Sequence, residues 1–240
     1  MMGKITYPDR YMYGKKKDVT SDDHFKELLL RAKFYREERR IRSMEDPRIK
    51  DINIEALLSI LWYFGLRIGE IVGDIPRKYK VMNKETKKKD ITKTSKGHKG
   101  IWKQDIEIEG SLLKITSDKP LKHGERTNPL YAHLNEPGVY EIIEVWKETL
   151  DRRDRLFPIG KKLAWLLVTE STKKVDKRTG EVVEYYYPHY FRLNRATKFL
   201  NQPETTILEM QEWFGWTDPR TIKEYKGRAG KTTKKMADRL

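Results

Sequence analysis

The sequence of 240 residues contains no cysteine. This absence excludes disulfide bonds, zinc sites built from thiolates and cysteine nucleophiles. Long hydrophobic segments are also missing, because the longest apolar run, residues 56–66, falls far short of the roughly 20 residues that span a bilayer. Residues 1–10 lack the apolar core of a signal peptide. Together these absences predict a soluble protein of the cytoplasm with no membrane partner.

Acidic residues are outnumbered by basic ones. The sequence has 36 aspartates and glutamates against 51 lysines and arginines, which gives a net charge of +15 at pH 7. Such a charge is typical of a nucleic-acid-binding protein, although a lysine-rich surface could serve solubility alone. Richness in lysine and glutamate without cysteine also suits a thermophilic source. The five histidines are scattered without a carboxylate cluster, so we expect neither a metal ion nor another cofactor.

Hydrophobic periodicity predicts a mainly helical α+β fold. Apolar residues recur at helical spacing over 21–44, 52–73 and 138–153, and the second of these segments is the most apolar, with Asn53 as its cap. Alternating apolar and polar residues over 103–131, interrupted at two glycines, predict a small three-stranded antiparallel sheet. A second hairpin is predicted around the turn at 176–180, although residues 164–171 before it could equally form a helix.

The C-terminal part is divided by prolines and glycines. Pro188 suits the first turn of a helix and Pro203 ends it, which predicts a helix over 188–200. Pro203 begins a second helix that ends at Gly215. A last short helix, with Thr217 or Asp218 as its cap, is predicted to carry Tyr225 and to end at Gly227.

Residues 77–103 form a strongly basic stretch. It contains eleven lysines and arginines, opposed by Glu85 and Asp90, and shows little apolar periodicity. We therefore expect an extended loop here.

His189 and Arg192 are three positions apart on the predicted helix 188–200, so they share one face. The pair suits a phosphate, because the arginine can bind the anion while the histidine handles protons beside it. Alone it is a weak signal, since basic proteins often contain such pairs for structural reasons.

Two further segments strengthen this interpretation. GLRIGEI at 65–71 places Arg67 after Gly-Leu near the end of an apolar helix, and Trp216 follows Arg192 by 24 positions and precedes Tyr225 by nine. Taken together, residues 50–227 resemble the tyrosine recombinases, the family of phage and archaeal integrases. The resemblance implies their mainly helical catalytic domain, which breaks and rejoins DNA.

The resemblance also implies the chemistry. Tyr225 would attack a DNA phosphodiester and form a covalent 3′-phosphotyrosine, which stores the energy of the ester for rejoining without ATP or metal. Arg67 and Arg192 would stabilise the negative charge of the transition state. A lysine of a β-hairpin protonates the leaving 5′ oxygen in the family, and Lys119 is the first candidate for this role, with Lys122 as the alternative.

The other two site residues have supporting roles in the resemblance. His189 would assist proton transfer or bind the phosphate, and Trp216, which stands where many members have histidine, can offer an indole N–H and packing. Plain core packing is the alternative for Trp216. Tyr225 is one of 13 tyrosines and is distinguished by its spacing from Trp216 and Arg192.

The function implied is that of a site-specific recombinase, such as the integrase of an archaeal virus or plasmid. Its partner would be double-stranded DNA, and strand exchange would require four protomers. A type IB topoisomerase, which relaxes supercoils as a monomer, is one alternative. A degenerate homologue that only binds DNA is the other.

The chain departs from the family in two places. Residues 1–48 are predicted to be a helical segment that replaces a larger DNA-clamping domain, in reduced or truncated form, and residues 49–240 to be the catalytic domain with a basic tail from 226. Lys119 follows Arg67 by 52 positions, much of which is the basic insertion 77–103. We hypothesise that this insertion tracks the phosphate backbone of DNA; a solvated, disordered loop is the equal alternative.

Overall fold

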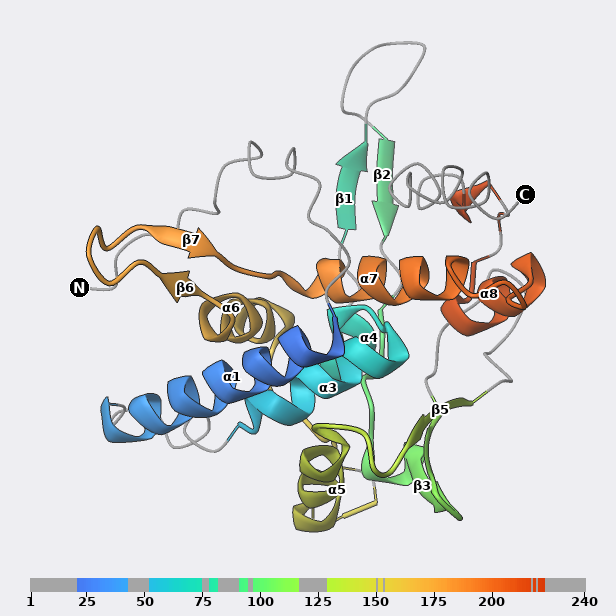
Figure 1. The fold of residues 1–240 in the computed structure, drawn as a ribbon. Coiled ribbons are helices and arrows are strands. Elements are labelled where there is room, and N and C mark those ends of the chain that lie inside the picture. The colour runs from blue at the N-terminus through green and yellow to red at the C-terminus, as the bar shows by residue number, and fades with distance from the viewer. Residues whose placement is uncertain are drawn as a thin grey trace, which may run out of the picture.

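The structure is a computed structural model of the 240 residues (Figure 1). It describes residues 21–42, 52–74, 78–81, 91–94, 97–116, 129–149, 151–152, 154–216, 218 and 220–222.

Helix α3, Ile54–Phe64, forms the centre of the helical body. All of its residues are buried. It packs against α1 (Asp22–Arg42), α5 (Val139–Glu148), α6 (Lys161–Ser171) and α7 (Pro188–Leu200), as Figure 1 shows. Phe25, Leu28 and Ala32 of α1 are fully buried in the same core, so the first described helix is part of this body.

The apolar segment 52–73 is two helices, whereas the sequence predicted one. Asn53 caps α3 as expected, because its side chain accepts a hydrogen bond from the N–H of Ala56 over 2.9 Å. Gly65 then adopts a left-handed conformation, with φ of 59°, and ends α3. The chain restarts as α4, Ile68–Val72. The glycine therefore breaks a helix that hydrophobic periodicity alone would continue.

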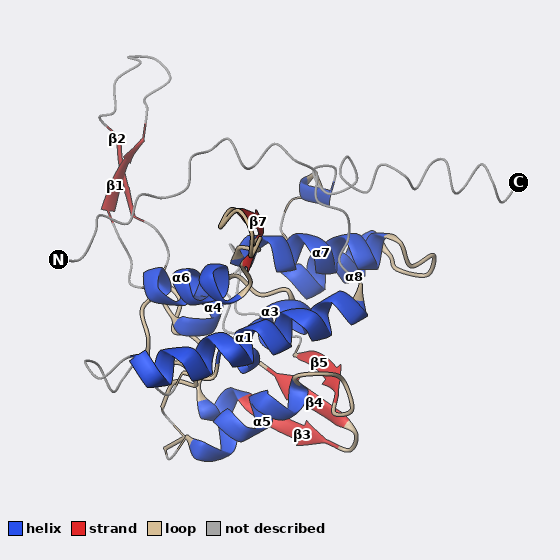
Figure 2. Ribbon diagram, turned by 60° about the vertical axis from the view of Figure 1, so that its left-hand side comes forward, coloured by secondary structure: helices blue, strands red, loops and turns tan. Residues whose placement is uncertain are grey.

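The predicted three-stranded antiparallel meander is confirmed. It consists of β3 (Ile106–Glu109), β4 (Leu112–Ile115) and β5 (Leu130–His133), with β4 in the middle. Leu113 pairs with both Ile108 and Ala132, and it is fully buried. Figure 2 shows this sheet at one side of the helical body, beside α5.

The sequence left open whether residues 164–171, before the turn at 176–180, form a strand or a helix. Residues 164–171 lie within helix α6, Lys161–Ser171. The hairpin is short and consists of β6 (Lys174–Val175) and β7 (Val182–Glu184).

The two helices that follow carry the C-terminal part of the core. Helix α7, Pro188–Leu200, begins and ends as predicted, with Pro188 in its first turn. Helix α8, Ile207–Phe214, starts later than expected from Pro203, because Thr206 is its N-cap and accepts a hydrogen bond from the N–H of Glu209. Gly215, with φ of 58°, ends α8 as predicted. Most of the last predicted helix, including Tyr225, lies outside the described residues.

The expectation of an extended loop over 77–103 is wrong for its described parts. Strands β1 (Lys78–Val81) and β2 (Ile91–Thr94) form an antiparallel hairpin, and Lys103–Asp105 form a 3₁₀ turn, η2. The strands are only four residues long, so they are too short to dominate a periodicity search. Tyrosine, valine and isoleucine among the lysines nevertheless favour strands.

Candidate active site

The break between α3 and α4 positions Arg67. Gly65 ends α3, Leu66 is buried, and Arg67 follows as the N-cap of α4 with an extended backbone. The side chain of Arg67 is 47% exposed. Only glycine suits position 65, because an added Cβ would lie 2.7 Å from Cε1 of Phe214 and the φ angle is positive. The Gly-Leu-Arg sequence thus turns the chain so that the arginine starts a new helix at the surface.

Glu70 is the acid that holds this arginine. Its side chain is fully buried, and Oε1 accepts a hydrogen bond from Nη1 of Arg67 over 2.9 Å. Oε2 accepts the backbone N–H of Arg67 over 2.8 Å, so Glu70 also caps the first turn of α4. Nη1 of Arg192 lies 3.9 Å from the same Oε2. One carboxylate therefore holds two guanidinium groups whose residues are far apart in the sequence.

Arg192 is 1% exposed and connects three helices. From α7, it donates a hydrogen bond to the carbonyl of Gly65 over 2.7 Å and another to the carbonyl of Phe214 over 2.8 Å. These two oxygens lie at the C-terminal ends of α3 and α8, where the helix macrodipoles favour a cation. The guanidinium carbon also lies 5.0 Å from the ring centre of Phe214. Arg192 is therefore both a charge beside Glu70 and a link between the helix ends.

Trp216 packs against both Arg192 and Phe214. It is 6% exposed and stacks on Phe214, with ring centres 4.7 Å apart and an interplanar angle of 19°. The guanidinium carbon of Arg192 lies 5.9 Å from its ring. The backbone N–H of Trp216 donates to the carbonyl of Gln211 over 2.9 Å, which fixes the chain after the left-handed turn at Gly215. Trp216 is therefore a buried packing residue beside Arg192, which both its expected supporting role and the plain core alternative predict.

His189 lies in the first turn of α7, three positions before Arg192, and is exposed. The helix places the two residues on the same side. The remaining expected site residues, Lys119, Lys122 and Tyr225, lie outside the described residues. Their roles stay predictions.

The second arginine of α7, Arg195, packs beside Gly65. Its guanidinium carbon lies 4.6 Å from the ring centre of Phe199 and 5.4 Å from that of Trp213. Burial lowers the pKa of Arg195, against the opposing effect of the nearby Glu136 carboxylate. Its Cβ would lie 3.3 Å from a Cβ at position 65, so Gly65 is enclosed by α7 and α8 together.

Comparison with known proteins identifies the fold. No model of a known protein family matches the sequence, and no curated protein matches it. Among solved structures, the site-specific recombinase XerH in a post-cleavage complex with a palindromic difH substrate matches with a TM-score of 0.52 at 12% sequence identity, over 99% of this chain. The chain has a tyrosine recombinase fold. XerH in a pre-cleavage complex with difH, over 88% of this chain at 12% identity, and XerA recombinase, over 92% at 17% identity, both give a TM-score of 0.49.

These matches cover only part of the solved recombinases. The chain spans 57% of the XerH chain in the post-cleavage complex, 50% in the pre-cleavage complex and 61% of the XerA chain. The mainly helical fold with a small three-stranded antiparallel sheet, predicted from the sequence, is confirmed as this recombinase fold.

Sequence reasoning missed three features of this recombinase fold. The backbone carbonyls of Gly65 and Phe214 accept hydrogen bonds from Arg192, and the Phe214 ring packs against both Arg192 and Trp216. A signal was present, because Gly65 and Gly215 both end helices and so leave carbonyl groups that require donors. Sequence alone does not show which donor reaches both helix ends.

Two broader properties of the described residues bear on the site. None of the described helices is long and apolar enough to cross a membrane. Within the described part of the chain, no group of three or more histidines, aspartates and glutamates is arranged to hold a metal ion.

Proposed function

We propose that the chain is a site-specific tyrosine recombinase that cleaves and rejoins double-stranded DNA, as the integrase of a mobile element does. The observation that carries this proposal is the shared carboxylate of Glu70, which brings Arg67 and Arg192 to one place in a recombinase fold. Two fixed guanidinium groups suit the extra negative charge of phosphoryl transfer better than mobile ammonium groups do.

The two arginines have different roles in this proposal. Arg67 is half-exposed, so it can bind the non-bridging oxygens of a phosphate at the surface. Arg192 is buried behind the same carboxylate. It adds positive charge from beneath and holds Glu70 and the ends of α3 and α8 in position. Trp216 supports Arg192 by packing on Phe214.

The reaction itself would be carried by residues expected from the resemblance. The phenol oxygen of Tyr225 attacks the phosphorus and forms a phosphotyrosine ester, while the bond from phosphorus to the 5′ oxygen breaks. Lys119, or Lys122 in its place, gives the leaving 5′ oxygen its proton. His189, exposed on the first turn of α7, takes up the phenol proton or binds the phosphate. Rejoining reverses these transfers, so the cycle needs neither ATP nor a net supply of protons.

DNA is the proposed partner for two reasons. The net charge of +15 suits a polyanion, and XerH of the same fold is described in complex with its difH substrate. Exchange between two duplexes would bring four protomers together. In this arrangement each protomer supplies one cleavage.

The proposal is tested by trapping the covalent intermediate. The probe is a pool of labelled duplexes with a randomised core, nicked beside the core so that the short strand released by cleavage diffuses away. The wild-type chain should form a protein–DNA band that survives denaturation, and sequencing of the bound strands should recover a defined site. Tyr225→Phe should abolish the band, because it removes the attacking oxygen. Tyr140→Phe is the matched control and should leave the band unchanged, since Tyr140 is 61% exposed on α5.

Three results would contradict the proposal. A band that persists in Tyr225→Phe would place the nucleophile elsewhere. Bands without any preferred site, together with relaxation of a supercoiled plasmid by the wild type, would indicate a topoisomerase. Tight DNA binding with no band would indicate a homologue that only binds DNA.

A further inference from the structure

The hairpin of β1 and β2 stands outside the helical body in both orientations of the molecule (Figures 1 and 2). It is a two-stranded antiparallel sheet, and among the described residues no third strand pairs with it. Figure 2 shows it on the opposite side of the molecule from the β3–β5 sheet. It therefore forms a separate surface, which the site residues described above do not use.

Asp74 and His98, the described residues on either side of the hairpin, form its base and are fixed to the body. Asp74 and His98 face each other as an antiparallel bridge, in which the N–H of each donates to the carbonyl of the other over 2.8 and 3.0 Å. Nζ of Lys161 at the start of α6 forms an ion pair with Asp74 over 3.0 Å. Just inside the bridge, the N–H of Ile101 donates to the carbonyl of Ile71 over 2.8 Å, and Ile101 is fully buried.

Two glycines make this close approach possible. Gly73 and Gly100 both have φ of 84°, and a Cβ added to Gly100 would lie 2.8 Å from the backbone nitrogen of Gly73. The two chain segments that enter and leave the insertion are therefore in direct backbone contact. The described residues on either side of the insertion therefore form a rigid support at the surface of the helical body.

The support belongs to the same helix as the candidate site. Ile71 lies in α4, whose N-cap is Arg67, and Gly73 ends that helix. At 1.5 Å of rise per residue, the six residues from Arg67 to Gly73 span about 9 Å. A DNA duplex placed with a phosphate at Arg67 would therefore pass close to the base of the hairpin.

The register of the strands separates a polar face from a largely apolar one. Lys78 pairs with Thr94 and Lys80 with Thr92, so these four positions share one face, because residues alternate sides along a strand. Tyr79, Val81, Ile91 and Lys93 occupy the other face. None of the eight strand residues is acidic. Lysine and threonine are both donors to phosphate oxygens, and a two-stranded ribbon fits the major groove, which is about 12 Å wide.

We propose that the β1–β2 hairpin is a DNA-binding arm, with the face of Lys78, Lys80, Thr92 and Thr94 on the phosphates that flank the cleavage point. The inference rests on the proposed function and extends it, because it assigns a second DNA contact to a surface away from the residues around Glu70. The bound species is a duplex, recognised through its backbone charge. The segments on either side of the arm contact α4, whose N-cap is Arg67, so the arm would bind the same duplex as Arg67.

The arm is tested by the salt dependence of DNA binding. In Lys78→Gln/Lys80→Gln, two phosphate contacts are lost, so the slope of log affinity against log salt concentration should fall in magnitude by about 1.8, at about 0.9 per contact. The measurement is fluorescence anisotropy with a labelled duplex of the site recovered above, or of random sequence, between about 50 and 200 mM salt. The matched control is Lys177→Gln/Arg178→Gln, which removes the same charge from exposed positions of the other hairpin turn. Its slope should stay at the wild-type value.

A deletion variant gives the second measurement. Residues 75–97 are replaced by Asn-Gly, which can join the bridged residues Asp74 and His98 as a two-residue turn. This variant should keep the cooperative unfolding of the wild type, bind DNA with the reduced slope, and still form the Tyr225-dependent band at saturating protein.

The outcomes separate the arm from the proposed function. An unchanged salt slope in both arm variants overturns the proposal that the hairpin binds DNA, whatever the result of the trapping experiment. A change of oligomeric state in the arm variants, with the DNA slope unchanged, overturns it too and identifies a second copy of the chain as the occupant. If the wild type forms no covalent band but the arm variants show a reduced salt slope, the DNA-binding arm is supported. Only the proposed recombinase chemistry is then rejected.

Discussion

Two buried glutamates, Glu55 at the start of α3 and Glu70 in α4, show how similar surroundings serve different ends. Each lies in the first turn of a helix, where the positive end of the macrodipole favours a negative charge. Their side chains are 4% and 0% exposed. Among the described residues, Glu55 forms an ion pair with one cation, Arg36 of α1, over 2.9 Å. Glu70 is shared between Arg67 and Arg192, which come from two separate segments.

The hydrogen bonds of the two carboxylates differ as well. Among the described residues, Oε2 of Glu55 has no hydrogen-bond partner, and burial raises the pKa of this carboxyl against the opposing effect of Arg36. Both oxygens of Glu70 are engaged by Arg67, and Arg192 is an additional neighbour. Burial of an acid therefore does not by itself mark a functional site. The number of cations that the acid gathers, and the exposure of one of them, distinguish the region of Glu70.

The largest effect is expected when the buried cation of Glu70 is removed. Arg192→Leu leaves Glu70 with one cation and deprives the carbonyls of Gly65 and Phe214 of a donor. The free energy of unfolding should fall by about 3 to 5 kcal/mol, the usual cost of breaking a buried ion pair from one side. Urea unfolding at pH 7 measures this loss.

The matched substitution is Arg36→Leu at the single cation of Glu55. Its loss should be smaller, because the side chain of Arg36 is 20% exposed and Glu55, with its raised pKa, can take up a proton instead. Equal losses for the two leucine variants, or a larger loss for Arg36→Leu, would break the distinction between the two glutamates.

The sequence predicts the helices around Glu70 better than it predicts the contacts of Glu70 with Arg67 and Arg192. Pro188 and Gly215 have local conformational effects, so the start of α7 and the end of α8 follow from residue type. Gly65 acts in the same local way, but the apolar residues on both sides of it suggest one continuous helix. The motif around Arg67 indicates a charged site residue, whereas Gly65 before it determines where that residue lies.

The remaining contacts depend on tertiary packing. The meeting of Arg192 with Gly65 and Phe214 joins segments that no local pattern connects. The fixed base at Asp74 and His98 is equally invisible in a stretch that composition presents as a basic loop. The roles of Lys119, Lys122 and Tyr225 stay predictions from spacing.

A smaller effect is expected from a neutral isostere of the shared acid. Glu70→Gln keeps an oxygen for the N–H of Arg67 but removes the charge that holds its guanidinium. A hydrogen bond to a charged group contributes about 1.5 to 3 kcal/mol, so the covalent band should form roughly 10 to 100 times more slowly at saturating protein. The measurement is a time course of the denaturation-resistant band. Glu55→Gln serves as the control and should match the wild-type rate; an equal slowing there would remove the distinction.

The smallest expected effect is a change in the pH dependence of stability when Glu55 is replaced. Burial places the folded-state pKa of Glu55 above its unfolded value, so the folded chain binds this proton more tightly than the unfolded chain does. Ionisation of Glu55 therefore lowers stability as the pH rises from the ordinary value near 4.5 through the raised folded pKa. Glu55→Gln removes this loss. Relative to the wild type, the variant should gain stability with rising pH over that window, and the gain should then level off.

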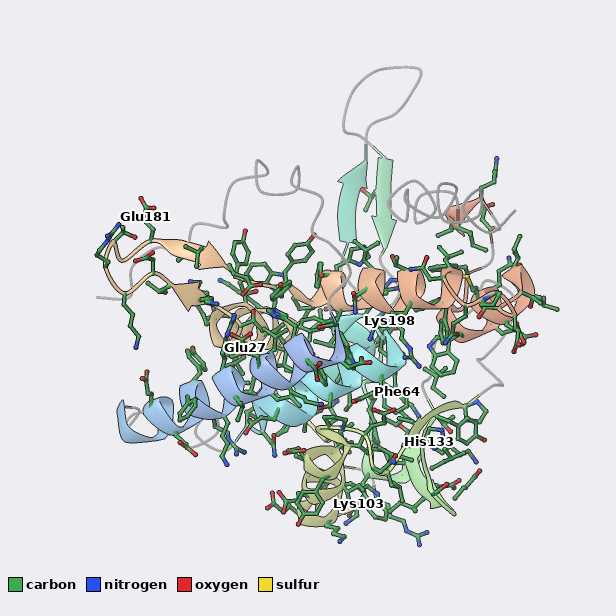
Figure 3. All side chains as sticks on the ribbon, in the orientation of Figure 1. Glu27, Phe64, Lys103, His133, Glu181 and Lys198 are labelled. Atoms are coloured by element: carbon green, nitrogen blue, oxygen red, sulfur yellow. The ribbon has the colours of Figure 1, made fainter. Side chains whose placement is uncertain are left out.

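Urea midpoints between about pH 4 and 8 measure this difference across the titration window. The control is Glu181→Gln, an exposed position at the β6–β7 hairpin, which Figure 3 shows at the edge of the molecule. Its difference from the wild type at each pH is the baseline with which the Glu55→Gln difference is compared. A gain for Glu55→Gln that is largest at low pH would mean that Arg36 holds the carboxylate ionised in the folded state. Glu55 would then resemble Glu70 in being stabilised as an anion, and cation number alone would no longer account for the difference between the two regions.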